Sequence, residues 1–123
     1  MNTGIKHIEF WVSNLEKSLN FYKQLFTIIN WQLVDDNGFT DGDTKIYFIE
    51  QPVNLIPSVG PRHICFLAHS KATVDEVGKF LKNFNMSTIR GPLESDFKGR
   101  SSYTVDFKDP DGYIIEVATK SML

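Results

Sequence analysis

The stretch HIEFWV, residues 7–12, recurs in altered form as HICFLA, residues 63–68. The two histidines are 63 − 7 = 56 residues apart, and the same offset carries Leu25 onto Leu81. The first stretch alternates polar and apolar residues and the second is a short apolar run, and both patterns favour β-strands. An internal duplication of this kind decides the fold, because each copy then forms the same unit of structure.

An amphipathic helix is expected after each of these strands. SNLEKSLNFYKQLF begins with Ser13 and Glu16 at the spacing of a capping box, and TVDEVGKFLKNF begins with Thr73 and Glu76 at the same spacing. Apolar residues recur in both segments every three or four positions, as on the buried face of a helix.

Further strands are expected at 28–34 and 45–50, and the DPDG of residues 109–112 predicts a tight turn between two final strands. The segment RGPLESDFKGRSS, residues 90–102, predicts a polar loop. The order strand, helix, strands therefore occurs twice. We expect an α+β fold, with one domain over 1–123 made of two βαβββ modules, about 1–56 and about 57–123.

Composition excludes several classes of protein. The 123 residues are 41% apolar and 23% charged with a net charge of −2, which gives no reason to expect nucleic acid or an anionic membrane as a partner. The single cysteine excludes a disulfide framework and a multi-cysteine zinc site. The chain starts without a basic segment and a long apolar run, and nowhere approaches the ~20 apolar residues of a membrane span. We expect a cytoplasmic protein.

Each module carries a histidine on its first strand and a glutamate late in its last strand: His7 and Glu50, then His63 and Glu116. A single histidine on a strand is usually packed or solvated, but matching positions in two repeats would place all four side chains around one axis. Two imidazoles and one or two carboxylates suit Fe(II), Mn, Co, Ni or Zn. The alternative for Glu50 is a solvated carboxylate at a strand end.

Five more residues are candidates for lining a cleft beside these histidines. Glu9 shares a strand face with His7 and is interpreted as a partner of the site, an acid–base group or a charged rim residue. For the others, packing in the core is the alternative. The candidates are Glu9, Trp11, Phe48, Cys65 and Tyr103.

HIEFWVSNLEKSLNFYKQLF, RHICFLA and YTVDFKDPDGYIIEV together resemble the vicinal oxygen chelate superfamily. That superfamily includes glyoxalase I, fosfomycin-resistance enzymes, extradiol dioxygenases and bleomycin-resistance proteins. The resemblance implies two tandem βαβββ modules forming a curved, partly closed mixed sheet around a metal-binding cleft. It also implies a homodimer.

The resemblance places metal ligands on His7, His63 and Glu116, with Glu50 as the fourth ligand of a glyoxalase I-like site. One divalent ion per site is implied: Ni, Zn, Co, Mn or Fe(II). Glu50 is the first candidate for the proton-transfer base and Glu116 the second.

The function expected from the resemblance is a metal-dependent enzyme acting on a small oxygenated molecule, with glyoxalase I-like lyase or isomerase chemistry. The alternatives are a non-catalytic binding protein like the bleomycin-resistance proteins, a dioxygenase, and a fosfomycin-resistance-type transferase. Basic residues that could hold the carboxylates of a thiol cosubstrate are Arg62, Arg90, Lys98 and Arg100.

Overall fold

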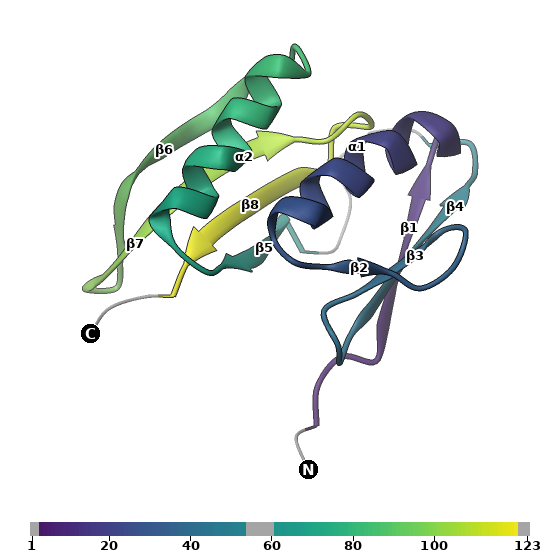
Figure 1. The fold of residues 1–123 in the computed structure, drawn as a ribbon, viewed down its shortest axis with the longest axis horizontal. Helices are drawn as coiled ribbons and strands as arrows, with labels where there is room; N and C mark the ends of the chain where they lie inside the picture. The colour runs from purple at the N-terminus through teal and green to yellow at the C-terminus, as the bar shows by residue number, and fades with distance from the viewer. Residues whose placement is uncertain (1–2, 54–60, 121–123) are drawn as a thin grey trace. The chain divides into compact units, whose positions relative to one another are not determined.

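A computed structural model describes residues 3–53 and 61–120. The chain divides into two compact units, 1–56 and 57–123, and each is a four-stranded sheet with one helix against it (Figure 1). This confirms the α+β fold with two tandem βαβββ modules. The expectation of one partly closed sheet is corrected, because hydrogen bonding divides the described strands into two open sheets.

The first unit has strand order β1-β4-β3-β2, with β1 and β4 parallel and the other pairs antiparallel. Its elements are β1 (His7–Val12), α1 (Leu15–Ile28), β2 (Gln32–Leu33), β3 (Gly38–Thr40) and β4 (Lys45–Glu50). The strand expected at 28–34 is reduced to two residues, because the helix continues to Ile28 and the chain then turns at Ile29 and Asn30, where Asn30 has a φ of 66°.

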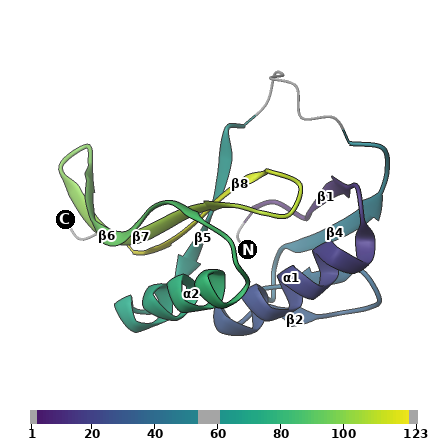
Figure 2. The ribbon, with the colours of Figure 1, turned by 90° about the horizontal axis from the view of Figure 1, so that it is seen from above.

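The second unit repeats this arrangement with order β5-β8-β7-β6 and a parallel β5–β8 pair. Its elements are β5 (His63–Ala68), α2 (Lys71–Asn83), β6 (Thr88–Phe97), β7 (Arg100–Lys108) and β8 (Ile114–Thr119). In Figures 1 and 2, α2 lies along one face of this sheet.

Strands β1 and β5 have the same pattern of burial, residue for residue. Phe10 and Val12 of β1 are buried, as are Phe66 and Ala68 of β5, because these side chains face the helix of their unit. The alternating polar positions, which include both histidines, face away from the helix. Each sheet therefore presents an open face on which polar side chains gather.

The core of the first unit is built from aromatic rings. Tyr22 and Phe26 of α1 pack on Phe48 of β4 with ring centroids 4.4 and 6.4 Å away, and Phe39 of β3 lies 4.8 Å from Phe26. All four side chains are essentially inaccessible to solvent. Full burial of such a ring contributes about 2–3 kcal/mol, so this cluster stabilises the module substantially.

Both helices begin at different residues from those expected. The side chain of Asn14, one residue after Ser13, caps α1 by accepting from the Lys17 amide at 3.0 Å. Ser70 caps α2, three residues before the expected Thr73. Asn and Ser are as effective at the N-cap position as Ser and Thr are, so the capping-box spacing alone could not show which of the neighbouring residues caps each helix.

The polar segment at 90–102, expected to be a loop, is mostly a β-hairpin of β6 and β7. Gly91 and Pro92 suggested a break, but they form an irregularity in β6 where the register with β7 shifts. The DPDG turn is confirmed: Asp109 accepts from the amides of Asp111 and Tyr113 and joins β7 to β8.

No helix among the residues that the structure describes is long and apolar enough to cross a membrane.

Two glycines of this hairpin provide a matched test of its packing. Gly91 and Gly99 both have positive φ, at 87° and 75°. A Cβ on Gly91 would lie 2.3 Å from the Thr104 carbonyl oxygen, whereas a Cβ on Gly99 would meet nothing within 4 Å. We expect Gly91→Ala to lower the free energy of unfolding by at least about 2 kcal/mol more than Gly99→Ala, measured by urea denaturation. Equal losses would contradict the close approach of β6 to β7.

Candidate functional site

The parallel register of β5 with β8 brings a histidine and a glutamate together on the open face of the second unit. Cys65 is the Cα partner of Glu116, and His63 precedes Cys65 by two residues on the same face. His63 Nε2 lies 3.0 Å from Glu116 Oε1. The glutamate is largely buried and the histidine about one third exposed, so the pair lies at the surface of the sheet with one side open.

Both members of the pair are held by neighbours. The Thr104 hydroxyl donates to Glu116 Oε2 at 2.6 Å, and Arg62 Nη1 lies 3.2 Å from His63 Nδ1. A guanidinium can only donate, so the arrangement assigns Nδ1 as acceptor and gives the proton of the neutral ring to Nε2, which donates to Glu116. Oε1 of Glu116 and Nε2 of His63 therefore face one another, while Thr104 holds the other oxygen of Glu116 and Arg62 holds the other ring nitrogen of His63.

The spacing of this pair fits two ligands of one metal ion. Nitrogen and oxygen ligands about 2.1 Å from an ion are about 3.0 Å apart at a right angle and about 3.4 Å apart at a tetrahedral angle. The observed 3.0 Å is within that range. An ion bound there would replace the proton on Nε2, the ring proton would then be on Nδ1, and Arg62 would have to give up its contact with that atom. Among residues 3–53 and 61–120, no group of three or more His, Cys, Asp or Glu side chains is placed to hold a metal.

The pair forms part of the wall of a hollow of about 600 Å³ on this sheet. Arg62, Arg90 and Lys120 supply positive charge to its lining, and Asp96 and Asp106 add negative charge to that of Glu116. Arg90 is fixed from two sides, with Nε 3.4 Å from Asp106 Oδ2 and Nη1 donating to Ser95 Oγ at 3.0 Å. The hollow can therefore receive a small polar molecule with an anionic group.

Cys65 lies beside Glu116 in the same hollow. Burial of the thiol and then the charge of the Glu116 carboxylate raise the pKa of Cys65 to about 12. A thiol with this pKa is protonated at neutral pH and is a poor nucleophile. Cys65 thus lines the hollow without being an activated thiol.

In the first unit, His7 lies on the open face of β1 and its nearest aromatic neighbour is Tyr47 of β4. The ring centroids are 6.0 Å apart and the rings meet edge to face. Glu9 and Trp11 lie further along the same face, and the Trp11 indole donates to Glu9 Oε2 at 2.7 Å. About half of the Trp11 side chain is exposed. Glu9 is therefore engaged by Trp11.

The structure does not bring Glu50 to His7. The Cα partner of His7 on β4 is Lys45, and the partner of Glu50 is Val12 at the far end of β1. Five residues of strand separate the two positions, about 16 Å, so one ion cannot contact both in the same chain. The Glu50 carboxylate instead accepts from the Leu15 amide at 2.9 Å, at the start of α1.

Register shows which residue of the first unit corresponds to Glu116. In the second unit Glu116 lies two residues beyond Ile114, the partner of His63. Two residues beyond Lys45, the partner of His7, is Tyr47. The two modules are thus asymmetric at this point, with a phenol in one and a carboxylate in the other.

Two further cleft candidates lie elsewhere. Phe48 is completely buried in the aromatic core of the first unit. The Tyr103 hydroxyl donates to Asp75 of α2 at 2.7 Å, and Lys71 of α2 lies over its ring. Tyr103 therefore faces the helix, on the opposite side of β7 from Thr104. The expectation that Phe48 and Tyr103 line the cleft is corrected.

Thr104 and Asp106 are site residues that the sequence pattern did not indicate. Both lie on β7 at alternate positions, with Thr104 opposite Ala118 and Asp106 opposite Glu116 of β8. Alternation on either side of the buried Val105 could have indicated them once the hairpin was known.

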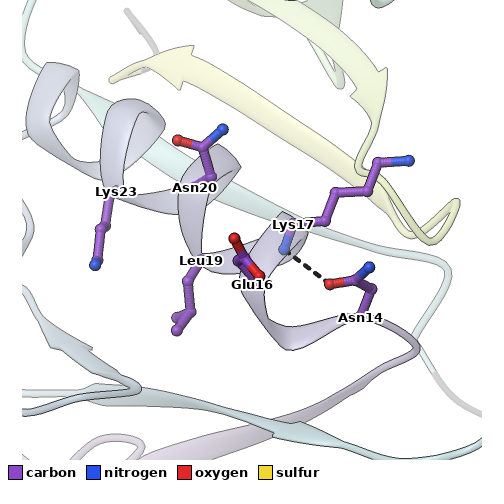
Figure 3. Close-up of a pocket in the computed structure, with 6 residues that line it drawn as sticks. All are labelled: Asn14, Glu16, Lys17, Leu19, Asn20 and Lys23. Atoms are coloured by element: carbon purple, nitrogen blue, oxygen red, sulfur yellow. Dashed lines mark hydrogen bonds between the residues drawn. The ribbon is translucent and has the colours of Figure 1, made fainter.

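A second hollow lies on the exposed side of α1 (Figure 3). Its lining comes from Asn14 and one helix: Glu16, Lys17, Leu19, Asn20 and Lys23. No histidine lines it, and its lining residues do not come from separate strands. It is therefore a weaker candidate for a functional site than the hollow beside His63 and Glu116.

The comparisons with known proteins agree with this architecture. Residues 4–117 match the model of the Glyoxalase/Bleomycin resistance protein/Dioxygenase superfamily. Among characterised relatives, a metallothiol transferase FosB from Shouchella clausii (strain KSM-K16) is 29% identical over 131 residues, which covers 99% of this chain and 84% of the relative.

Solved structures match over nearly the whole chain. A glyoxalase/bleomycin resistance protein from Albidiferax ferrireducens T118 is 20% identical with a TM-score of 0.75, covering 94% of this chain and 98% of the other. A lactoylglutathione lyase from Agrobacterium tumefaciens is 23% identical with a TM-score of 0.66, covering 96% and 94%. These two likenesses concern the fold. The chain belongs to the Glyoxalase/Bleomycin resistance protein/Dioxygenase superfamily.

Proposed function

We propose that the protein is a metal-dependent enzyme acting on a small, anionic, oxygenated molecule, with His63, Glu116 and His7 as metal ligands. The observation that carries this proposal is the 3.0 Å pair of His63 and Glu116, whose donor atoms have the spacing of two ligands. Glu50 is left out of the ligand set because its carboxylate is bound at the start of α1.

The bound ion would supply Lewis acidity to the oxygens of the substrate. The chain's own residues then have separate tasks. Thr104 keeps one oxygen of Glu116 occupied, so Oε1 is the atom that faces the ligand side and can accept or return a proton. Arg90, fixed by Asp106 and Ser95, presents its remaining N–H groups to an anionic part of the substrate.

Glyoxalase I-like lyase or isomerase chemistry remains our first candidate reaction. With Glu50 engaged elsewhere, Glu116 becomes the candidate for moving the proton between neighbouring carbons of the substrate. Its position suits this task, because Thr104 holds Oε2 and Oε1 is directed at His63.

Thiol transfer is the second candidate, for two reasons. The FosB relative matches 99% of the chain and is described as a metallothiol transferase. In the first module the position that corresponds to Glu116 is Tyr47, so that position has no second carboxylate to act as a base. Here a thiol sulfur would bond to an electrophilic carbon of the substrate as a carbon–oxygen bond breaks, and the thiol proton would go to the released oxygen.

Two copies of the chain are proposed to complete the site between them. The open faces of β1 and β5 carry exposed apolar side chains, Trp11 and Leu67. Burying these side chains against a second copy of the chain would stabilise a dimer. In this arrangement His7 of one copy serves His63 and Glu116 of the other.

Metal binding tests the ligand set. Protein freed of metal by dialysis and titrated with Zn²⁺ should bind about one ion per chain, and His63→Ala or Glu116→Gln should weaken binding at least about 100-fold because each removes a direct ligand. His69→Ala, outside the strands, is the control and should bind as the wild type does. Isothermal titration calorimetry gives the comparison, and a wild type that binds no Zn²⁺, Ni²⁺ or Mn²⁺ would refute the proposed function.

Mixing variants tests whether the site is shared. His7→Ala and His63→Ala should each bind Zn²⁺ poorly, but a mixture refolded together should regain binding, because one of the two sites in each mixed dimer then has both histidines and the other has neither. Each variant refolded alone is the control. A mixture that binds no more than its components would place the whole site within one chain.

Turnover distinguishes the two reactions. Protein loaded with Ni²⁺ or Zn²⁺ should consume methylglyoxal in the presence of glutathione, followed by absorbance, if the lyase assignment holds. Consumption of fosfomycin with glutathione or cysteine, but not of methylglyoxal, would favour the transferase. In either case Glu116→Gln should reduce turnover by at least about 100-fold. Binding of metal without turnover of either substrate would point to a non-catalytic binding protein.

A further inference from the structure

The Asp106 carboxylate on β7 is left incompletely partnered by the protein. Oδ2 lies 3.4 Å from Arg90 Nε, but Oδ1 is buried and has no hydrogen-bond partner among the described residues. A buried carboxylate oxygen without a donor is costly, so this atom is suited to a group that the chain itself does not supply.

Asp106 is the direct cross-strand neighbour of Glu116. The register runs across the sheet from Arg90 of β6 to Asp106 of β7, to Glu116 of β8 and to Cys65 of β5. Directly opposed side chains on one face have Cβ atoms about 5 Å apart, and like charges in such positions repel. Two carboxylates therefore lie next to each other on the wall of the hollow.

The charges around the pair are balanced without an ion. The guanidiniums of Arg90 and of Arg62, which lies 3.2 Å from His63 Nδ1, stand against the carboxylates of Asp106 and Glu116. A histidine that ligates a metal must be neutral, and Asp106 is the one carboxylate of this row besides Glu116. Because no three candidate ligands among the described residues are placed to contact one ion, Asp106 would act through the water around the ion and not as a direct ligand.

We propose that Asp106 is a positioning residue for the cation site, whose carboxylate accepts a hydrogen bond from the hydration shell of an ion held at His63 and Glu116. This inference rests on the proposed function. It assigns a hydrogen-bond donor to the buried Oδ1 of Asp106.

The hollow contains a matched control. Asp96 is also an acidic residue of the lining, but its Oδ1 already accepts from the Ser101 hydroxyl at 2.5 Å. In Asp106→Asn the amide oxygen stays with the Arg90 donor, so the NH₂ group takes the place of the unpartnered oxygen. The substitution thus removes both the charge and the acceptor with little change in volume, whereas Asp96→Asn removes a charge at a position that is already partnered.

The test is a calorimetric titration of the full-length, metal-free protein with Zn²⁺. We expect the dissociation constant to rise at least about 10-fold in Asp106→Asn, which is the usual effect of removing a partner of this kind, and to change by less than about threefold in Asp96→Asn. Arg90→Gln should change it in the opposite direction, towards tighter binding, because it removes the opposing positive charge. Loss of structure alone would not produce effects of opposite sign.

The outcomes are distinguishable from failure of the proposed function. A wild type that binds no Zn²⁺ refutes both ideas. A wild type that binds, with Asp106→Asn unchanged or no weaker than Asp96→Asn, overturns this inference alone. Should Asp106→Asn fail to fold, judged by circular dichroism, Arg90→Gln decides: tighter binding supports the role of Asp106, and unchanged or weaker binding overturns it.

Discussion

Parallel pairing of β5 with β8 is the constraint on which the site depends. A parallel pair needs a long connection between its strands, and here α2 and the β6–β7 hairpin fill that connection. The pairing fixes which residues face each other, and a slip of one residue would turn Glu116 from the open face into the core against α2. Burial of Ile115 and Val117 on the helix side therefore holds Glu116 on the other side.

The hairpin adds the remaining groups to this frame. β7 lies beside β8 and contributes Thr104 and Asp106, and β6 contributes Arg90. Each of these side chains contacts another polar group of the same face, so the face is a network of bonds and not a set of independent charges. Such networks hold their members in fixed positions, which is a requirement for orienting a small ligand.

Much of the fold could be predicted from the sequence because it depends on pattern. The alternation in residues 7–12, the amphipathic helices and the DPDG turn each follow from local chemistry, and their repetition gives the two modules. His63 and Glu116 came from the same reasoning, and the structure places them together. β6 and the first residues of β7 were missed because this segment is largely polar and contains Gly91 and Pro92, whereas the rest of β7 was predicted as the strand before the DPDG turn.

Glu50 was misplaced for a different reason. It was matched to Glu116 because each ends an apolar strand, but strand ends do not define register. The cross-strand partners of the two histidines, Lys45 and Ile114, are 114 − 45 = 69 residues apart, whereas the two glutamates are 116 − 50 = 66 apart. Sequence alone does not show which residues of two strands lie opposite each other, so Tyr47 was not recognised as the counterpart.

That counterpart has a consequence for how the two halves have diverged. A duplicated module begins with two equal copies of every position, and selection can retain chemistry in one copy while the other takes up a different task. Here the second module has the carboxylate of Glu116, and the first has the phenol of Tyr47 beside His7. Glu50 of the first module accepts a hydrogen bond at the start of α1 instead. The arrangement of the strands is the same in both modules, and the chemistry of the corresponding positions 47 and 116 is not.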